Sequence, residues 1–133
     1  MTHNNNAPHL NGISILRWSG NSSEPIVLSA QFELSNISFF KRNGAQQMIT
    51  FFGRTVAKRT TAGQRQTVQY ENYNCHVYRR NDGLCGVVTA DMDYPQRAAF
   101  VILSKLLEEF CTEFVGKWEI QTNDNGFAEW PNL

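Results

Sequence analysis

The sequence lacks an apolar run long enough to cross a membrane, which takes about 20 consecutive residues. The most apolar segment, residues 100–114, is interrupted by Ser104, Lys105 and a pair of glutamates. The first residues, MTHNNNAPHLNG, contain neither the basic nor the apolar region of a secretory signal. These absences predict a protein that stays inside the cell and does not span a membrane by itself.

The chain also lacks net charge, because 12 basic residues balance 12 acidic ones. Basic residues and tyrosines between Lys41 and Arg80 are interleaved as on some nucleic-acid-binding surfaces. The chain has no net positive charge that would attract nucleic acid. These basic residues and tyrosines are therefore explained more simply as parts of solvent-exposed helix and strand faces. We therefore expect no nucleic-acid partner.

Residues suited to catalysis or metal binding are few and scattered. Cys75, Cys85 and Cys111 match neither a disulfide framework nor a zinc site, so we expect reduced, buried thiols. His76 is the only histidine outside the amino-terminal tail, and no nucleophile motif accompanies it. Asp91 and Asp93 are better explained as charges that complement the dipole of a following helix. We predict no enzyme, catalytic residue, metal or cofactor.

The pattern along the chain predicts an α+β fold in one domain. Residues 1–9 are polar and aperiodic, which indicates a disordered tail, and residues 10–133 form the domain. The expected elements are a hairpin at residues 13–18 and 26–30, a packed loop at 32–42, a helix at 43–59, an edge strand at 64–72, a hairpin at 73–80 and 84–90, and a helix after Pro95.

The order ββαβββα is typical of a five-stranded antiparallel sheet with a helix on each face. Residues 84–90 are almost continuously apolar, as in a central strand that is covered on both sides. After Trp118 the periodicity is lost and the sequence becomes rich in turn residues.

One flank of the first predicted helix is unexpectedly apolar. The core stripe of that helix consists of Ala45, Ile49, Phe52 and Val56. At about 100° per residue, Phe51 lies roughly 120° from this stripe, and Met48 lies between them. A helix broad enough to bury both flanks would explain this, but a groove beside the edge strand would also explain it, and such a groove would accept a peptide. The predicted groove residues are Met48, Phe51, Thr55, Thr67, Val68 and Tyr70, with Phe39 and Phe40 as a supporting loop.

Several blocks of sequence resemble a known family in order and spacing. They are NYNCHVYRRNDGLCGVV at residues 72–88, SFFKR at 38–42 and MITF at 48–51. Together they are similar to the longin domain of the lipid-anchored, Ykt-type R-SNAREs, which are synaptobrevin-like proteins. The resemblance extends from Leu10 to Phe114.

This resemblance implies a profilin-like longin fold, with one helix on one face of the sheet and two on the other. It also implies an amino-terminal regulatory domain of an R-SNARE in vesicle-membrane fusion, including ER to Golgi transport. In that family the domain folds back onto its own SNARE core and lipidated tail, and it also meets other SNAREs or trafficking proteins. The implied location is cytoplasmic, with peripheral association to Golgi, vesicle or other endomembranes through the lipidated tail.

Phe51 matches the family's groove aromatic, whereas Met48 stands where relatives tend to carry phenylalanine. The heptad SNARE motif, the prenylation signal and the last helix of the family have no counterpart in these 133 residues. We therefore expect a module that regulates without fusing membranes, and whose uncovered sheet surface favours self-association.

Two other functions remain open on the sequence alone. A longin-like subunit of an adaptor or tethering complex would share the fold but bind its partner subunits permanently. A profilin-like binder of actin or polyproline would present a cluster of exposed aromatic residues, for which Trp118 and Trp130 are the candidates.

Overall fold

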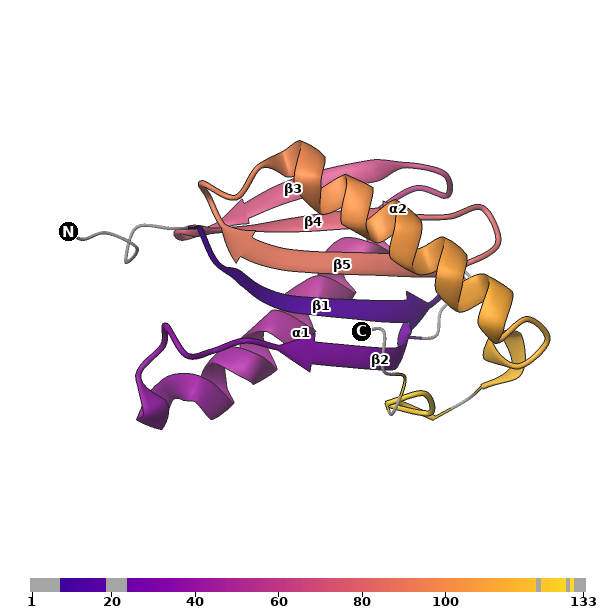
Figure 1. The fold of residues 1–133 in the computed structure, drawn as a ribbon, viewed down its shortest axis with the longest axis horizontal. Helices are drawn as coiled ribbons and strands as arrows, with labels where there is room; N and C mark the ends of the chain where they lie inside the picture. The colour runs from indigo at the N-terminus through magenta and orange to yellow at the C-terminus, as the bar shows by residue number, and fades with distance from the viewer. Residues whose placement is uncertain (1–7, 19–23, 122, 129, 131–133) are drawn as a thin grey trace.

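The computed structural model describes residues 8–18, 24–121, 123–128 and 130. Within these residues, five strands form one antiparallel sheet with a long helix on each face (Figure 1). The order ββαβββα and the α+β class are confirmed. The elements are β1 (Leu10–Arg17), β2 (Ile26–Phe32), the single-turn η2 (Phe39–Lys41), α1 (Arg42–Lys58), β3 (Arg65–Tyr70), β4 (Tyr73–Arg79), β5 (Leu84–Asp91), α2 (Gln96–Glu113) and the single-turn η3 (Trp118–Ile120).

The strands lie in the order β2-β1-β5-β4-β3, so β5 is central and β2 and β3 are the outer strands. Every residue of β5 except its last is buried, because helices cover both faces of the sheet there. The central and edge positions predicted from apolar content are therefore confirmed. The β4–β5 hairpin turns at Gly83, whose φ of +94° suits glycine.

Each helix buries its apolar stripe against one face of the sheet. Val56 and Ala57 of α1 pack on Val77 of β4 and Val87 of β5. On the opposite face, α2 lies mainly over β4 and β5, and its buried stripe is longer than that of α1. The buried residues of that second face include Ile15, Leu28, Leu84, Val88, Leu103, Leu107 and Phe110. Each such side chain stabilises the fold by about 1.5–3 kcal/mol.

The segment after α2 covers the rest of that second face. No third long helix occurs in the described residues, but Trp118 and Trp130 are only 2% and 4% exposed. Both belong to the cluster that includes Ile15 and Leu28. The expectation of an uncovered apolar sheet surface was therefore wrong, because aromatic side chains carried by turns fill the place of a helix.

The same segment also runs along the outer edge of β2 (Figure 1). The backbone N–H of Asn125 donates to the carbonyl of Val27, and that of Phe127 donates to the carbonyl of Leu28, at 2.9 Å. Asp124 accepts from the N–H of Val27 at 3.0 Å. These bonds occupy part of the β2 edge, in contrast to β3, which pairs only with β4 among the described strands.

Two local predictions were wrong. Residues 32–42 do not form a packed loop, since Phe39 and Phe40 are 71% and 93% exposed on a single helical turn outside the sheet. Asp91 does not serve the dipole of α2, because it ends β5 and its Oδ2 accepts from the backbone N–H of His9 at 3.0 Å. The chain is thus already hydrogen-bonded at His9, and residues 1–7 of the predicted tail lie outside the described residues.

Candidate binding groove

A cleft of about 340 Å³ opens between α1, the turn that joins β3 to β4, and the segment that precedes α1. We call it the α1 groove. One group of its lining residues is apolar or aromatic, and the other consists of polar residues and one glycine. The lining consists of Ile37, Ala45, Met48, Ile49, Phe52, Tyr70, Tyr73 and Cys75, together with Asn11, Lys41, Gly44, Glu71, Asn74 and Thr89.

The helical wall of the groove follows from the spacing of its side chains. Ala45, Met48, Ile49 and Phe52 recur at steps of three and four residues, so they share one side of α1. The ring of Phe52 meets that of Tyr70 with 5.1 Å between their centroids. This contact joins the helix to the end of the edge strand, and both residues line the groove.

The mouth of the groove exposes apolar surface. Met48 is 47% exposed and Tyr70 is 43% exposed, one on each side of the opening. The turn between Tyr70 and Tyr73 is tight, and Glu71 adopts a positive φ of 53° within it. An exposed apolar surface beside a cleft is typical of a site that binds another molecule.

The lining of the groove includes a buried polar residue, Asn11, at a bulge in β1. The pairing of β1 with β5 shifts between Leu10 and Gly12, so Asn11 is an extra residue and its side chain is fully buried. Its Nδ2 donates to the carbonyl of Glu33 at 3.0 Å and to Oδ1 of Asn36 at 2.8 Å. Its Oδ1 has no donor among the described residues. Such a buried acceptor costs about 1–3 kcal/mol.

The structure brings together only part of the predicted groove. Met48 and Tyr70 line it, and Val68 faces the same side of the sheet but packs into the core beneath α1. Phe51, which is 66% exposed, and Thr55 instead line a separate shallow depression on the outer side of α1. Helical angles alone group Phe51 and Thr55 with Met48, but the structure places them on different sides of α1.

Thr67 lies on the opposite face of the sheet, so its assignment to the groove was wrong. Its Oγ1 is 2.9 Å from Nδ1 of His76. The ring of His76 in turn packs edge-on against Phe100 of α2. Because strand side chains alternate between faces, Thr67 and Val68 point in opposite directions.

Phe39 and Phe40, predicted as a supporting loop, lie outside the groove. Their rings contact each other with 5.6 Å between centroids, and the guanidinium of Arg42 lies over Phe39. Ile37 and Lys41 are the residues of this segment that line the groove. Sequence reasoning missed Ile37 and Asn11, and it assigned Ile49 and Phe52 to the core stripe alone.

Cys75, Cys85 and His76 are buried, whereas Cys111 is only partly buried, so the expectation of three buried thiols was wrong for Cys111. Burial raises the pKa of the Cys75 and Cys85 thiols to about 12, so neither forms a thiolate at neutral pH. Burial also lowers the pKa of His76, which favours the uncharged imidazole. No group of three metal-ligating side chains occurs in the part of the chain that the structure describes.

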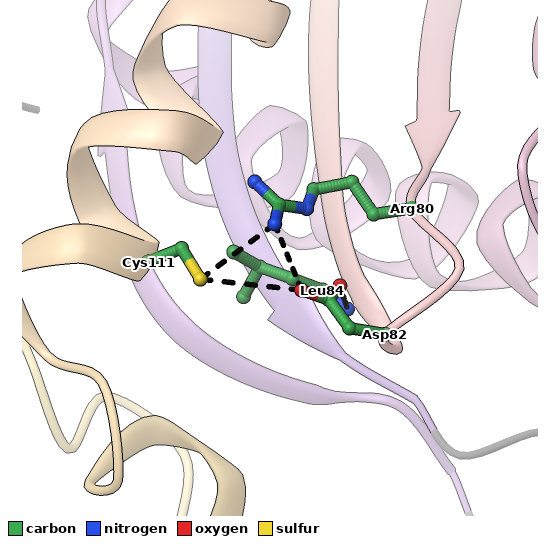
Figure 2. A network of polar contacts seen from close by, with 4 residues as sticks. All are labelled: Arg80, Asp82, Leu84 and Cys111. Carbon is green, nitrogen blue, oxygen red and sulfur yellow. Dashed lines mark hydrogen bonds and ion pairs between the residues drawn. The ribbon is translucent and has the colours of Figure 1, made fainter.

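Cys111 takes part in a polar network at the other end of the molecule (Figure 2). Arg80 donates to Asp82 at 2.9 Å, and its Nη2 lies 3.6 Å from the sulfur of Cys111. Asp82 also accepts from the backbone N–H of Leu84. The network ties the β4–β5 turn to α2.

The described helices include none that is both long and apolar enough to cross a bilayer.

Comparison with known proteins agrees with this architecture. Residues 34–130 match the model of the longin family, described as a regulated-SNARE-like domain. The chain is 51% identical over 98 residues to the synaptobrevin homolog YKT6 of Eremothecium gossypii, covering 74% of this chain and 48% of that protein. It is 46% identical over 112 residues to the synaptobrevin homolog ykt6 of Schizosaccharomyces pombe, covering 83% and 55%. It is 37% identical over 124 residues to the VAMP-like protein YKT61 of Arabidopsis thaliana, covering 93% and 61%.

The chain therefore belongs to the longin family, and within it to the longin domains of Ykt-type R-SNAREs. It spans about half the length of the curated relatives it matches.

Proposed function

We propose that this chain is the regulatory amino-terminal module of an R-SNARE in vesicle-membrane fusion, and that it acts by holding a polypeptide segment in the α1 groove. Membership of the longin family, described as a regulated-SNARE-like domain, supports a role beside SNARE proteins. The groove itself is the main support for this binding site, because Met48 and Tyr70 are exposed at its mouth beside an apolar wall.

The occupant we propose is a segment of the protein's own SNARE core or lipidated tail, with other SNAREs or trafficking proteins as competing partners. A segment held in the groove is unavailable for the helical bundle that SNAREs form, so capture is autoinhibitory. Release then depends on which partner binds the segment more tightly. We place this cycle in the cytoplasm and at the surfaces of Golgi, vesicle or other endomembranes.

Three features of the groove suit reversible capture. Met48 adapts its flexible thioether to different side chains, and Tyr70 supplies a rigid aromatic surface with a polar end. Lys41 and Glu71 place opposite charges among the lining residues, which orients a segment without a strong preference for one net charge. The β3 edge beside the groove offers main-chain hydrogen bonds to an extended segment.

The test is a titration of the isotope-labelled domain with a synthetic peptide that covers the SNARE motif of the Eremothecium gossypii relative. Saturable amide shifts at residues 45–52 and 70–75 are expected, and a scrambled peptide should leave these signals in place. Shifts confined to the α2 face would contradict the proposed site. A folded domain that binds no SNARE peptide would instead favour a permanent subunit of an adaptor or tethering complex.

A further inference from the structure

We infer that the single turn η2 is a membrane-docking point, at which the rings of Phe39 and Phe40 enter the interface of a bilayer that contains anionic phospholipid. The inference goes beyond the proposed function, because it gives the domain a contact with the membrane that does not depend on the lipidated tail.

The two rings project from the molecule on a turn outside the sheet. Phe40 is 93% exposed, the highest value among the large apolar side chains of the described residues, and Phe39 is largely exposed as well. The segment between β2 and α1 extends beyond the end of β2 (Figure 1). Neither ring lines the α1 groove. Whatever covers this site must therefore accept a projecting aromatic pair.

Hydrogen bonds hold the turn in this exposed conformation. Nε of Arg42 donates to the carbonyl of Ile37 at 2.9 Å, and the backbone N–H of Lys41 donates to the carbonyl of Ser38 at 2.8 Å. The Arg42 guanidinium also lies over the Phe39 ring, 5.6 Å from its centroid, in a cation–π contact. The rings are thus fixed outside the core before any partner arrives, so docking requires little further ordering.

The charge around the rings is complementary to an anionic surface. The chain is neutral overall, but residues 34–70 contain no acidic residue and six basic ones, which are Lys41, Arg42, Arg54, Lys58, Arg59 and Arg65. Glu33 is the nearest acidic residue before this stretch, and its carboxylate accepts from the backbone N–H of Ser35. Lys41 forms no ion pair among the described residues. Because Lys41 directly follows the rings, its ammonium reaches the lipid phosphates when the rings are buried.

A bilayer fits this site better than a second copy of the chain. A phenylalanine buries about 150–250 Å², so the pair supplies at most about 500 Å², whereas each partner in a stable protein interface buries about 800 Å². The neighbouring residues Asn36, Ser38 and Asn43 are exposed and polar, so they add little apolar area. Lipid headgroups solvate such polar side chains while the rings reach the boundary of the acyl chains.

The docking point adjoins the α1 groove, because Ile37 and Lys41, on either side of the rings in the sequence, both line that groove. Docking brings this edge of the groove to the bilayer surface. A lipidated segment that leaves the groove there enters the membrane with little exposure of its apolar chain to water.

The test is sedimentation of the domain with sucrose-loaded vesicles, either of phosphatidylcholine with about 30% phosphatidylserine or of phosphatidylcholine alone. The wild-type domain should bind the anionic vesicles, and Phe39→Ser/Phe40→Ser should weaken this binding at least about tenfold. Phe51→Ser/Ile120→Ser is the matched control, because it removes two apolar side chains that are exposed elsewhere on the domain. It should change binding little.

Two further measurements localise the contact. Lys41→Gln should weaken binding to the anionic vesicles about fivefold and leave binding to the neutral vesicles unchanged. In bicelles of the anionic composition, a spin-labelled lipid should broaden the amide signals of residues 38–42 more than those of α2.

The inference would be overturned by a wild-type domain that ignores the anionic vesicles or binds both kinds equally. It would also be overturned if the control pair mattered as much as the phenylalanine pair, or if broadening centred on α2. A dimer formed through the rings without lipid, as seen by sedimentation velocity, would contradict it too. The SNARE-motif peptide tests the proposed function separately, because neither ring lines the α1 groove.

Discussion

Leu103 of α2 lies directly over Gly86 of β5, so closely that a Cβ added at Gly86 would come within 2.8 Å of the Leu103 Cδ2. Leu107 closes the same space from the next turn, at 3.2 Å. On the other face of the sheet, Gly53 of α1 stands over Val87, with 3.2 Å for the equivalent contact. The central strand is therefore in close contact with a helix on each face of the sheet, at the adjacent residues Gly86 and Val87.

Gly86→Ala should destabilise the protein by about 1–3 kcal/mol, because the new methyl group overpacks the contact with Leu103 and Leu107. Urea denaturation measures the change in unfolding free energy. Gly44→Ala is the matched control, since an added Cβ there meets nothing within 4 Å. It should stabilise the helix by about 0.5–1 kcal/mol. Equal effects of the two substitutions would contradict the close packing of α2 on Gly86.

Trp130→Ala should cost about 3–5 kcal/mol, as truncation of a large buried aromatic does. Trp130 packs against Phe110 and donates from Nε1 to Glu113 at 3.0 Å. Thermal and urea unfolding test this, with Ile120→Ala as the control because Ile120 is 76% exposed in the same segment. A Trp130→Ala protein as stable as the control would show that the segment after α2 does not cover the sheet in solution.

The stability of the domain should fall as pH drops below about 6.5, the ordinary pKa of histidine. Burial lowers the pKa of His76 in the folded state, so the unfolded chain binds the proton more readily. The contribution is complete above the unfolded pKa and is lost as pH falls toward the folded pKa. One proton changes the unfolding free energy by at most about 1.4 kcal/mol per pH unit.

Unfolding measured between pH 8 and pH 5.5 tests the role of His76, because carboxylates remain largely ionised in that range. His76→Gln should flatten the dependence on pH while keeping a polar group near Thr67. An unchanged slope in that variant would assign the effect to other groups.

Cys111 should be the only thiol that reacts with an aromatic disulfide reagent in the native domain at pH 8. Cys75 and Cys85 are buried and their pKa values are near 12, whereas Cys111 is partly exposed beside Arg80 (Figure 2). All three should react in denaturant. Cys111→Ser should abolish the native reaction and leave two reactive thiols after unfolding, and any rapid native reaction in that variant would contradict the buried positions.

The order of elements could be predicted because local patterns carry it. The apolar run at residues 84–90 and the stripe from Ala99 to Phe110 both reflect burial that the structure shows. The position of Thr67 could not be predicted in the same way. Alternation shows that Thr67 and Val68 face opposite sides, but only the packed sheet shows which side α1 covers.

The position of Asn11 was beyond sequence reasoning for a different reason. Asn11 is an extra, buried residue in the groove lining because a bulge shifts the pairing of β1 with β5, and pairing between strands about 75 residues apart leaves no local signal. The cover provided by Trp118 and Trp130 was missed similarly, since turns have no periodicity to read. The position of Asn11 and the cover by Trp118 and Trp130 both depend on contacts between distant segments and not on local secondary-structure propensity.

The most direct test of the α1 groove compares Met48→Glu with Phe51→Glu by calorimetric titration with the SNARE-motif peptide. Both changes place one carboxylate at an exposed apolar position of α1, three residues apart, and both variants should fold because the native side chains are 47% and 66% exposed. Only Met48 lines the groove. Met48→Glu should weaken binding by about tenfold or more, as expected for a charge buried against an apolar wall, while Phe51→Glu changes it little. The reverse order would place the binding surface on the outer side of α1 and contradict the account.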